Sequence, residues 1–242
     1  MRIDQLLVSR GLFDSRARAK AAIEAGLVTV DGAVVKKPSD IVADDADITA
    51  EAAHRFVGRG ALKLDHALTL WPVPVEGRAV LDVGASTGGF TEVCLERGAR
   101  RVFAVDVGQG QLHPRLAGDP RVSDLEKTDA RDLSPALIDE PPGLIVCDAS
   151  FIGLAKVLAK PLTLAEPGAD LVTLVKPQFE MDNRKGVGRG GVVRDDEARQ
   201  AALDRVVEWL DAEGWTVRAT ADSPISGGDG NREYLVWATR RT

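Results

Sequence analysis

Short apolar segments alternate with longer amphipathic segments from residue 78 to the end of the chain. The apolar segments read AVLDVG (79–84), RVFAVDV (101–107), GLIVCDAS (143–150), ADLVTLVK (169–176) and YLVWATR (234–240), with a weaker one near 121–125. Apolar runs of this length are typical of strands that are covered on both faces. Their regular alternation with helices, one of them expected over residues 154–165, predicts an open, mostly parallel α/β sheet with helices on both faces.

Residues 1–53 follow a different order, with two short amphipathic helices, a hairpin closed by an Asp-Gly pair, and a last short strand. Asp14 or Ser15 can cap the second helix, and Ala17 is expected on its buried face. An Asp-Gly pair favours a tight two-residue turn between antiparallel strands. This order predicts a small α+β domain ahead of the sheet.

The division between the two domains falls in the segment HRFVGRG, which has neither the helical nor the strand period. We therefore expect a small domain over residues 1–53, a linker over 54–59 and the sheet domain over 60–242. A length of 242 residues suits one small and one medium domain.

Composition indicates a soluble protein of a reducing compartment, and we expect it in the cytoplasm. No apolar run approaches the roughly 20 residues that cross a bilayer, and the charged N-terminus lacks the apolar core of a signal peptide. Two cysteines form neither a disulfide framework nor a zinc site, and the three histidines are scattered, so no metal is expected. We expect a monomer with no membrane partner.

The net charge of −6 is mildly unfavourable for a nucleic-acid partner, because phosphate contacts need lysine and arginine. The charge is unevenly distributed, however. Residues 2–37 carry seven basic and four acidic side chains, a local charge of +3, and an acidic stretch follows them. The N-terminal domain therefore has a basic side and an acidic side.

The two helices, the hairpin and the basic turn resemble the S4 RNA-binding domain over nearly all of residues 2–50, including SRARAKAAIEAGLVTVDG and KKPSD. In S4 domains, basic helix residues face RNA phosphates. The resemblance implies RNA contacts by Arg16, Arg18, Lys20, Lys36 and Lys37. A solvated basic face on a small packing module is the alternative.

A glycine-rich turn follows the first strand of the sheet domain, in AVLDVGASTGGFTEVCL. Its D-x-G-x-x-x-G-G spacing differs from the G-x-G-x-x-G of dinucleotide-binding proteins and from the P-loop. The next strand ends at Asp106, where a carboxylate can bind ribose hydroxyls. Together these features resemble motifs I and II of class I methyltransferases that use S-adenosylmethionine. The resemblance implies a cofactor site formed by Asp82, Gly84, Ala85, Ser86, Gly88, Gly89, Phe90, Asp106, Asp129 and Asp148.

Asp148 and Lys176 close the fourth and fifth strands, whose C-terminal ends lie beside the ligand crevice of a parallel sheet. Lys63 precedes the first strand, and Glu233 opens the last one. The set resembles the Lys-Asp-Lys-Glu tetrad of FtsJ-like RNA ribose 2′-O-methyltransferases. The resemblance implies that Lys176 accepts the proton of the ribose hydroxyl and that Lys63 helps to bind it. Asp148 and Glu233 would hold Lys176 in position; a plain buried ion pair of Asp148 and Lys176 is the alternative.

Methylation of a ribose hydroxyl requires a group that accepts its proton, and Lys176 can have this role. The hydroxyl is a poor nucleophile at neutral pH and must lose its proton as it attacks the sulfonium methyl group. A lysine accepts a proton only when it is itself deprotonated, which burial and a second nearby lysine favour. No metal is required.

Cys147 is a second candidate nucleophile, because enzymes that methylate cytosine C5 use a cysteine. It directly precedes Asp148 in its strand and so points to the opposite face. We therefore expect Cys147, like Cys94 in the first helix of the sheet domain, to lie in the core.

An S4 domain joined to an FtsJ-like domain resembles the TlyA family, also known as haemolysin A, across essentially the whole chain. The segments that carry the resemblance are SRARAKAAIEAG, GRGALKL, LDVGASTGGFT, CDASFIGL, LVKPQFE, GVVRD and NREYL. One departure is Thr87, where FtsJ proteins often have proline. The resemblance implies 2′-O-methylation of cytidine in ribosomal RNA of the large subunit, and in some members of the small subunit too. The short termini favour the large subunit alone.

Two other functions remain open at this point. The chain could be an RNA-binding ribosome-assembly factor with a non-catalytic methyltransferase fold, or a membrane-active haemolysin, as the family's older name suggests. The lack of a spanning or strongly amphipathic segment in the sequence argues against the second.

Residues 183–195, NRKGVGRGGVVRD, form a basic, glycine-rich segment that we interpret as a substrate-binding loop, with a flexible connector as the alternative.

Overall fold

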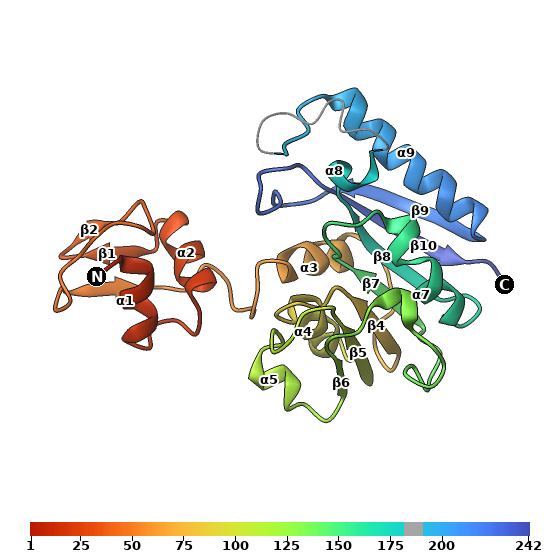
Figure 1. Ribbon diagram of the computed structural model, residues 1–242, viewed down its shortest axis with the longest axis horizontal. Helices are drawn as coiled ribbons and strands as arrows, with labels where there is room; N and C mark the ends of the chain where they lie inside the picture. Colours follow the sequence, from red (N-terminus) through yellow and green to blue (C-terminus); the bar gives the residue numbers. More distant parts are fainter. Residues whose placement is uncertain (182–190) are drawn as a thin grey trace. The chain divides into compact units, whose positions relative to one another are not determined.

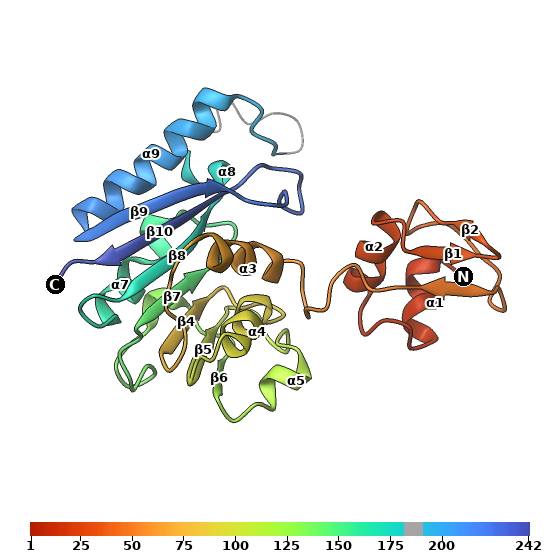
Figure 2. The same cartoon turned by 180° about the vertical axis from the view of Figure 1, so that it is seen from behind.

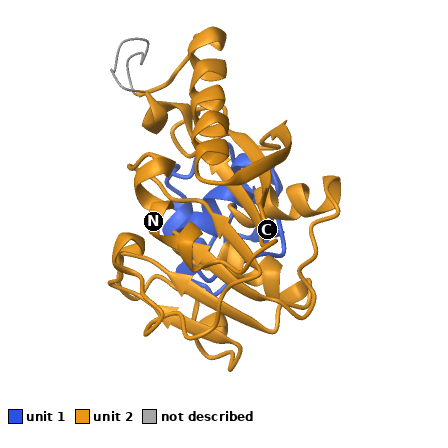
Figure 3. Cartoon of the chain, turned by 90° about the vertical axis from the view of Figure 1, so that its right-hand side faces the viewer, with its two compact units in different colours: residues 1–59 blue, residues 60–242 orange. Residues whose placement is uncertain are grey.

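The computed structural model describes residues 1–181 and 191–242, which fold into two compact units, Met1–Arg59 and Gly60–Thr242 (Figure 3). Each unit has its own apolar core. Of the basic segment 183–195, only residues 191–195 belong to the described part of the chain, so the expected substrate loop lies mostly outside it.

In the first unit, two helices pack on a small antiparallel sheet. Helices α1 (Ile3–Ser9) and α2 (Arg16–Glu24) accompany strands β1 (Val28–Val30), β2 (Ala33–Val34) and β3 (Ile48–Ala50), in the order β2-β1-β3. Their shared core consists of Ile3, Leu7, Phe13, Ala19, Ala22, Ile23, Val28 and Val35. The predicted order of two helices, a hairpin and a last strand is confirmed.

Local sequence accounts for the ends of these elements. The side chain of Ser15 caps α2 by accepting a hydrogen bond from the backbone N–H of Arg18. Asp31 and Gly32 connect β1 to β2 with φ values of 50° and 79°. Positive φ at both central residues is what a type I′ hairpin turn requires.

The prediction that Ala17 is buried is wrong. Ala17 is exposed, and Ala19 lies in the core with Ala22 and Ile23. Ala22 and Ile23 follow Ala19 by three and four residues, so the three side chains lie on one face of the helix. In α2, which begins at Arg16, this is the buried face.

The second unit is built on a seven-stranded sheet in the order β6-β5-β4-β7-β8-β10-β9 (Figures 1 and 2). Adjacent strands are parallel from β6 to β8, whereas β10 is antiparallel to both β8 and β9. The prediction of a mostly parallel α/β sheet is confirmed. The strands are β4 (Ala79–Val83), β5 (Arg101–Val105), β6 (Val122–Leu125), β7 (Leu144–Cys147), β8 (Asp170–Val175), β9 (Trp215–Asp222) and β10 (Tyr234–Arg240).

Helices cover both faces of this sheet. Helix α4 (Gly89–Glu96) packs on β4, β5 and the preceding helix α3 (Ala61–Leu70). The opposite face shares a core with α6 (Leu154–Val157), α7 (Ala159–Leu164) and α9 (Asp196–Ala212). All residues of β4, β7 and β8 are buried, which explains why these strands read as continuous apolar runs. The remaining short helices are α5 (Pro114–Ala117), η1 (Ala130–Asp132) and α8 (Pro177–Glu180).

The prediction of one helix over residues 154–165 is wrong, because the helix is interrupted at Leu158. Pro161 lacks the N–H group that would bond to the carbonyl of Val157. The helical path therefore breaks into α6 and α7 rather than continuing through this turn.

Strand β8 ends immediately before Lys176, and Pro177 begins α8. Proline is well suited to the first turn of a helix, where its missing N–H would have had no intrahelical partner. The chain therefore turns as soon as β8 ends, and Lys176 remains at the end of the strand.

Asp4 is the main buried charge of the first unit. It is 4% exposed and accepts hydrogen bonds from Arg2 (Nε to Oδ1, 3.0 Å) and Arg16 (Nη2 to Oδ2, 2.7 Å). The hydrogen bond from Arg2, aided by Arg16, lowers the pKa of Asp4 from 3.8 to about 2. Stability that this carboxylate contributes is therefore complete above its unfolded pKa and is lost as the pH falls through the folded value.

Replacing Asp4 with asparagine should weaken the first unit at neutral pH and leave it less sensitive to acid. Amide hydrogen exchange in α1 and α2 of the full chain, compared at about pH 5 and about pH 3, measures this local stability. The difference in protection between wild type and variant should shrink at the lower pH. A difference that stays constant would show that Asp4 carries no pH-dependent stability.

Candidate active site

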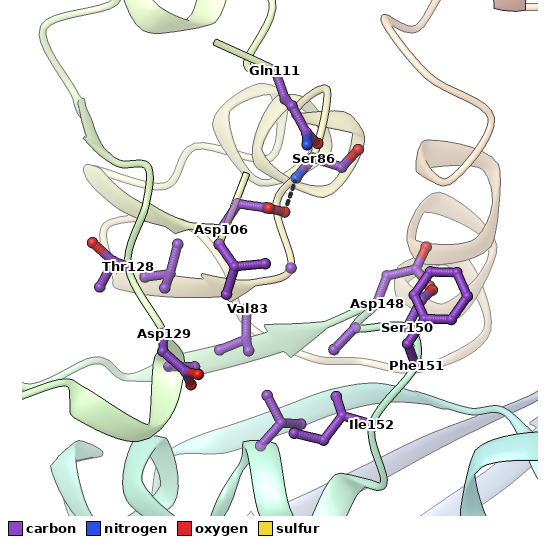
Figure 4. Close-up of a pocket in the computed structure, with 16 residues that line it drawn as sticks. Val83, Ser86, Asp106, Gln111, Thr128, Asp129, Asp148, Ser150, Phe151 and Ile152 are labelled. Atoms are coloured by element: carbon purple, nitrogen blue, oxygen red, sulfur yellow. Dashed lines mark hydrogen bonds between the residues drawn. The ribbon is translucent and has the colours of Figure 1, made fainter. Parts of the chain in front are cut away.

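A pocket of about 380 Å³ lies where the C-terminal ends of β4, β5 and β7 meet (Figure 4). This volume is in the range of small-molecule sites, and the edge is where open α/β sheets bind ligands. Its lining residues are Val83, Gly84, Ser86, Val105, Asp106, Val107, Gln111, Thr128, Asp129, Ala130, Asp148, Ala149, Ser150, Phe151, Ile152 and Val157.

The glycine-rich turn after β4 allows two loops to approach closely. Gly84 has a φ of 82°, and a Cβ placed there would lie 2.9 Å from the Cα of Ala149 in the loop after β7. Gly88 has a φ of 93° and would meet the side chains of Leu116 and Leu112. Both positions therefore require glycine, for conformation and for space.

Asp106 connects the end of β5 to this turn. Its Oδ2 accepts a hydrogen bond from the backbone N–H of Ser86 at 2.8 Å (Figure 4). Its Oδ1 accepts one from the backbone N–H of Gly108 at 2.7 Å. Each carboxylate oxygen keeps a second lone pair, so Asp106 can still accept hydrogen bonds from the hydroxyls of a ligand.

Asp129 lies on the other side of Asp106 from Asp148, Ser150 and Phe151 (Figure 4). It caps η1 through the N–H of Arg131, whose guanidinium also pairs with the carboxylate at 2.6 Å. The hydrogen bond from the Arg131 side chain lowers the pKa of Asp129. A carboxylate is thus held ionised at this end of the pocket.

Asp82 has a different place from the one predicted. It is fully buried within β4 and does not line the pocket; its Oδ2 accepts a hydrogen bond from Thr91 of α4 at 2.6 Å. Its Oδ1 has no hydrogen-bond partner among residues 1–181 and 191–242. Burial, with a smaller effect of the charge on Asp148, raises the pKa of Asp82 from 3.8 to about 7. Asp82 therefore connects β4 to α4, the two elements that flank the turn, and does not contact the pocket.

The other predicted cofactor residues divide in the same way. Gly84, Ser86, Asp106, Asp129 and Asp148 line the pocket, whereas Ala85, Gly88, Gly89 and Phe90 shape the turn and the start of α4 behind it. Sequence reasoning missed Gln111, Thr128, Phe151 and Ile152. Thr128, Phe151 and Ile152 follow strand ends at short distance, and this position in the chain is the local signal that points to them.

Four elements bring the predicted tetrad together. Lys63 comes from α3, Asp148 follows β7, Lys176 follows β8 and Glu233 precedes β10. Lys63 Nζ lies 2.6 Å from Glu233 Oε2 and 3.7 Å from Asp148 Oδ2. The expectation that Glu233 holds Lys176 is therefore wrong, because its carboxylate pairs with Lys63 instead. Lys176 Nζ lies 2.6 Å from Asp148 Oδ1. The carboxylate of Asp148 therefore lies between the two lysines, both of which are buried.

Lys176 has three acceptors around its amine. Besides the carboxylate of Asp148, its Nζ donates to the backbone carbonyl of Asp148 at 3.1 Å and to Ser150 Oγ at 2.7 Å. The 2.6 Å contact with the Asp148 carboxylate is an ion pair, and the other two contacts are hydrogen bonds. The lysine is thus oriented by the loop after β7.

Two glycines leave room for the acids of the tetrad. A Cβ at Gly60 would lie 3.2 Å from Asp148 Oδ2, and a Cβ at Gly227 would lie 2.6 Å from Glu233 Oε1. The second distance is shorter than any real Cβ contact, so a side chain at residue 227 would have to displace the carboxylate of Glu233.

Cys147 and Cys94 are both completely buried, as predicted. Burial raises the pKa of the Cys147 thiol to about 12 and also raises that of Cys94. A thiol acts as a nucleophile through its thiolate. Neither cysteine is therefore suited to nucleophilic catalysis, and Cys147 packs in the core with Ile145.

The basic residues predicted to contact RNA lie in the first unit. Arg16 pairs with Asp4 at 2.7 Å, Arg18 with Asp14 at 2.8 Å, and Lys20 lies 3.5 Å from Glu24. Lys36 and Lys37 follow β2 and are exposed. Three of the five cations therefore already have acidic partners within the unit.

The chain matches two families of known proteins. The FtsJ-like methyltransferase family matches residues 56–240, and the S4 domain matches residues 1–48. Over 243 aligned residues the chain is 45% identical to the 16S/23S rRNA (cytidine-2′-O)-methyltransferase TlyA of Mycobacterium tuberculosis, covering 100% of this chain and 90% of that protein. It is 33% identical to the 23S rRNA (cytidine-2′-O)-methyltransferase TlyA of Campylobacter jejuni, with 98% of each covered.

A solved structure of a candidate hemolysin from Streptococcus thermophilus has a similar fold. Its TM-score is 0.80 at 37% identity, covering 100% of this chain and 88% of that one. In the part of the present chain that the structure describes, no helix is long and apolar enough to span a bilayer.

The raised pKa of Asp82 predicts a pH-dependent stability that asparagine should remove. Because the folded chain holds this proton more tightly than the unfolded chain, the stabilisation is complete below about pH 4 and is lost as the pH rises through about 7. Urea unfolding of wild type and Asp82→Asn, without ligand, measures the free energy of unfolding. The variant should gain stability relative to wild type from about pH 5 to about pH 8. A constant difference would contradict a buried, protonated Asp82.

Proposed function

Because the chain belongs to the FtsJ-like methyltransferase family, in its TlyA branch, we propose that it methylates the 2′-hydroxyl of a cytidine ribose in ribosomal RNA. The methyl donor is S-adenosylmethionine. The observation that carries this proposal is the cluster of Lys63, Asp148, Lys176 and Glu233 at the edge of the pocket.

The pocket fits the proposed donor. A carboxylate with free lone pairs at the end of β5, here Asp106, suits ribose hydroxyls, and Asp129 suits the base end of a nucleoside. The turn at Gly84 and Ser86 would accommodate the amino-acid end. When bound, S-adenosylmethionine supplies an electrophilic methyl group on a sulfonium centre.

Lys176 is proposed as the base that receives the proton of the ribose hydroxyl. A hydroxyl attacks a methyl carbon only as it gives up its proton, so a nearby acceptor lowers the barrier. Asp148 contacts the amine of Lys176 through both its carboxylate and its backbone carbonyl. These contacts fix the position of Nζ at the rim of the sheet, which is what a positioned base requires.

Lys63 and Glu233 complete the arrangement. Lys63 bonds to Glu233 at 2.6 Å and approaches the far oxygen of Asp148 at 3.7 Å. Both lysines and Glu233 are buried, and the partly exposed Asp148 lies between the lysines, so that neither lysine is left as an isolated charge. We infer that Lys63 donates a hydrogen bond to the reacting hydroxyl while Glu233 holds it there.

The first unit is proposed to hold the RNA, with Lys36 and Lys37 as exposed phosphate contacts and Arg16, Arg18 and Lys20 beside them. The two curated relatives differ in substrate, since one is named for 16S and 23S rRNA and the other for 23S rRNA alone. We propose the large subunit as the main substrate. Ribosomal RNA as substrate would place the activity in the cytoplasm.

Replacing Lys176 with arginine or with alanine should abolish methyl transfer. Arginine can still pair with Asp148, but its guanidinium does not lose a proton in proteins, so it cannot act as a base. The measurement is transfer of labelled methyl groups to rRNA and to ribosomal subunits from cells that lack the gene. Both variants should lose at least about a hundredfold in rate.

Two controls make this test specific. Binding of S-adenosylmethionine should persist in both variants, since Lys176 is not among the described residues that line the pocket. Lys160→Ala, at an exposed position of α7, should keep the wild-type rate. An active Lys176→Arg variant would leave Lys176 only the role of an ion-pair partner.

Gly227→Ala should lower the rate of methyl transfer, whereas Gly228→Ala should not. A Cβ at residue 227 would lie 2.6 Å from Glu233 Oε1 and push this carboxylate away from Lys63, whereas at residue 228 it meets nothing within 4 Å. Misplacement of a catalytic group by about 1 Å can cost about a hundredfold in rate. Equal rates for the two variants would show that the contact of Glu233 with Lys63 does not matter for the reaction.

A further inference from the structure

Ser150 lies between the pocket and the amine of Lys176. Its side chain is exposed and lines the pocket, whereas Lys176 is 7% exposed and is not among the described lining residues. Ser150 Oγ is 2.7 Å from Lys176 Nζ, a short hydrogen bond (Figure 4 shows Ser150 beside Asp148 in the pocket). A molecule in the pocket therefore meets the serine hydroxyl at the surface and the lysine behind it.

The hydrogen bonds of Lys176 single out this serine. A lysine that is to accept a proton must be a neutral amine, with two N–H donors and one lone pair. Two of its three present partners, the carboxylate and the backbone carbonyl of Asp148, can only accept hydrogen bonds. Ser150 is the one partner that can also donate, because a hydroxyl is both donor and acceptor. Among these partners, Ser150 is therefore the group that can donate a hydrogen bond to the lone pair of a neutral amine.

The loop that carries Ser150 is fixed at both ends. The N–H of Asp148 bonds to the carbonyl of Val83 at 3.2 Å, and the N–H of Leu154 bonds to Glu180 Oε1 at 2.8 Å. Phe151 next to the serine has a φ of 68°, a conformation that residues other than glycine rarely adopt. A strained backbone of this kind persists when the surrounding structure holds it and is common at functional sites.

We propose that Ser150 relays the proton from the ribose hydroxyl to Lys176, a step that rests on the proposed methyl transfer. As the 2′-oxygen forms its bond to the methyl carbon, its O–H bond breaks and the proton passes to Ser150 Oγ. The proton that Ser150 held passes at the same time to Lys176 Nζ. The serine ends unchanged and the lysine ends as an ammonium, which later returns its proton to solvent. Ser150 is thus a catalytic residue in direct contact with the substrate.

The test compares Ser150→Ala with Ser150→Thr, which keeps a hydroxyl. Single-turnover methyl transfer is measured at saturating S-adenosylmethionine, on ribosomal subunits and rRNA from cells that lack the gene. Binding of S-adenosylmethionine is measured separately by calorimetry. We expect the alanine variant to be slower by about 10- to 100-fold and the threonine variant to stay within about fivefold of wild type. Both should bind the cofactor as wild type does, and Ser134→Ala, outside the pocket, should be unaffected.

Three results would overturn the relay. The alanine variant could keep the wild-type rate, the threonine variant could be as slow as the alanine variant, or the rate could fall only in proportion to weaker cofactor binding. Each would mean that the hydroxyl of Ser150 transfers no proton to Lys176 in the reaction. A wild-type protein that is inactive on every rRNA would instead refute the proposed function, so the two failures are distinguishable.

Discussion

The carboxylate of Asp148 is the contact on which the candidate site depends. Its two oxygens lie 2.6 Å from Lys176 and 3.7 Å from Lys63, and its backbone carbonyl also accepts from Lys176. A carboxylate can hold two lysines in this way only if its own backbone is fixed. The close packing of Gly84 on Ala149 and the bond of the Asp148 N–H to the carbonyl of Val83 fix that backbone, and the missing side chain at Gly60 leaves room for the carboxylate. The pocket and the tetrad thus meet at one residue.

The strands and the order of the fold could be predicted from the sequence because each buried strand is a continuous apolar run between turn signals. The hairpin of the first unit was equally clear from its Asp-Gly pair. The failures have local causes that compete with periodicity. Pro161 divides a segment whose apolar pattern is that of one helix. In α2, alanines occur on several sides of a short helix, so the sequence does not show whether Ala17 or Ala19 lies on the buried face.

The candidate site could be predicted only in part, for a physical reason. Residues at strand ends, such as Asp106 and Lys176, share an edge because the sheet is parallel, so their proximity follows from topology. The role of Asp82 depends instead on how deeply β4 is covered, and the contact of Ser150 with Lys176 depends on the path of a loop. The spacing of residues in the sequence predicts neither how deeply a side chain is buried nor the path of a loop. The buried acid and the serine therefore emerge only from the three-dimensional structure.

We propose that Lys176, held by Asp148, is the base with which this protein methylates a ribose hydroxyl of rRNA. A map of 2′-O-methylation across all rRNA tests it most directly, in cells with the wild-type gene, with Lys176→Ala and with the gene deleted. The wild-type map should contain at least one methylated cytidine that the other two maps lack. Identical maps in wild-type and Lys176→Ala cells would contradict the claim.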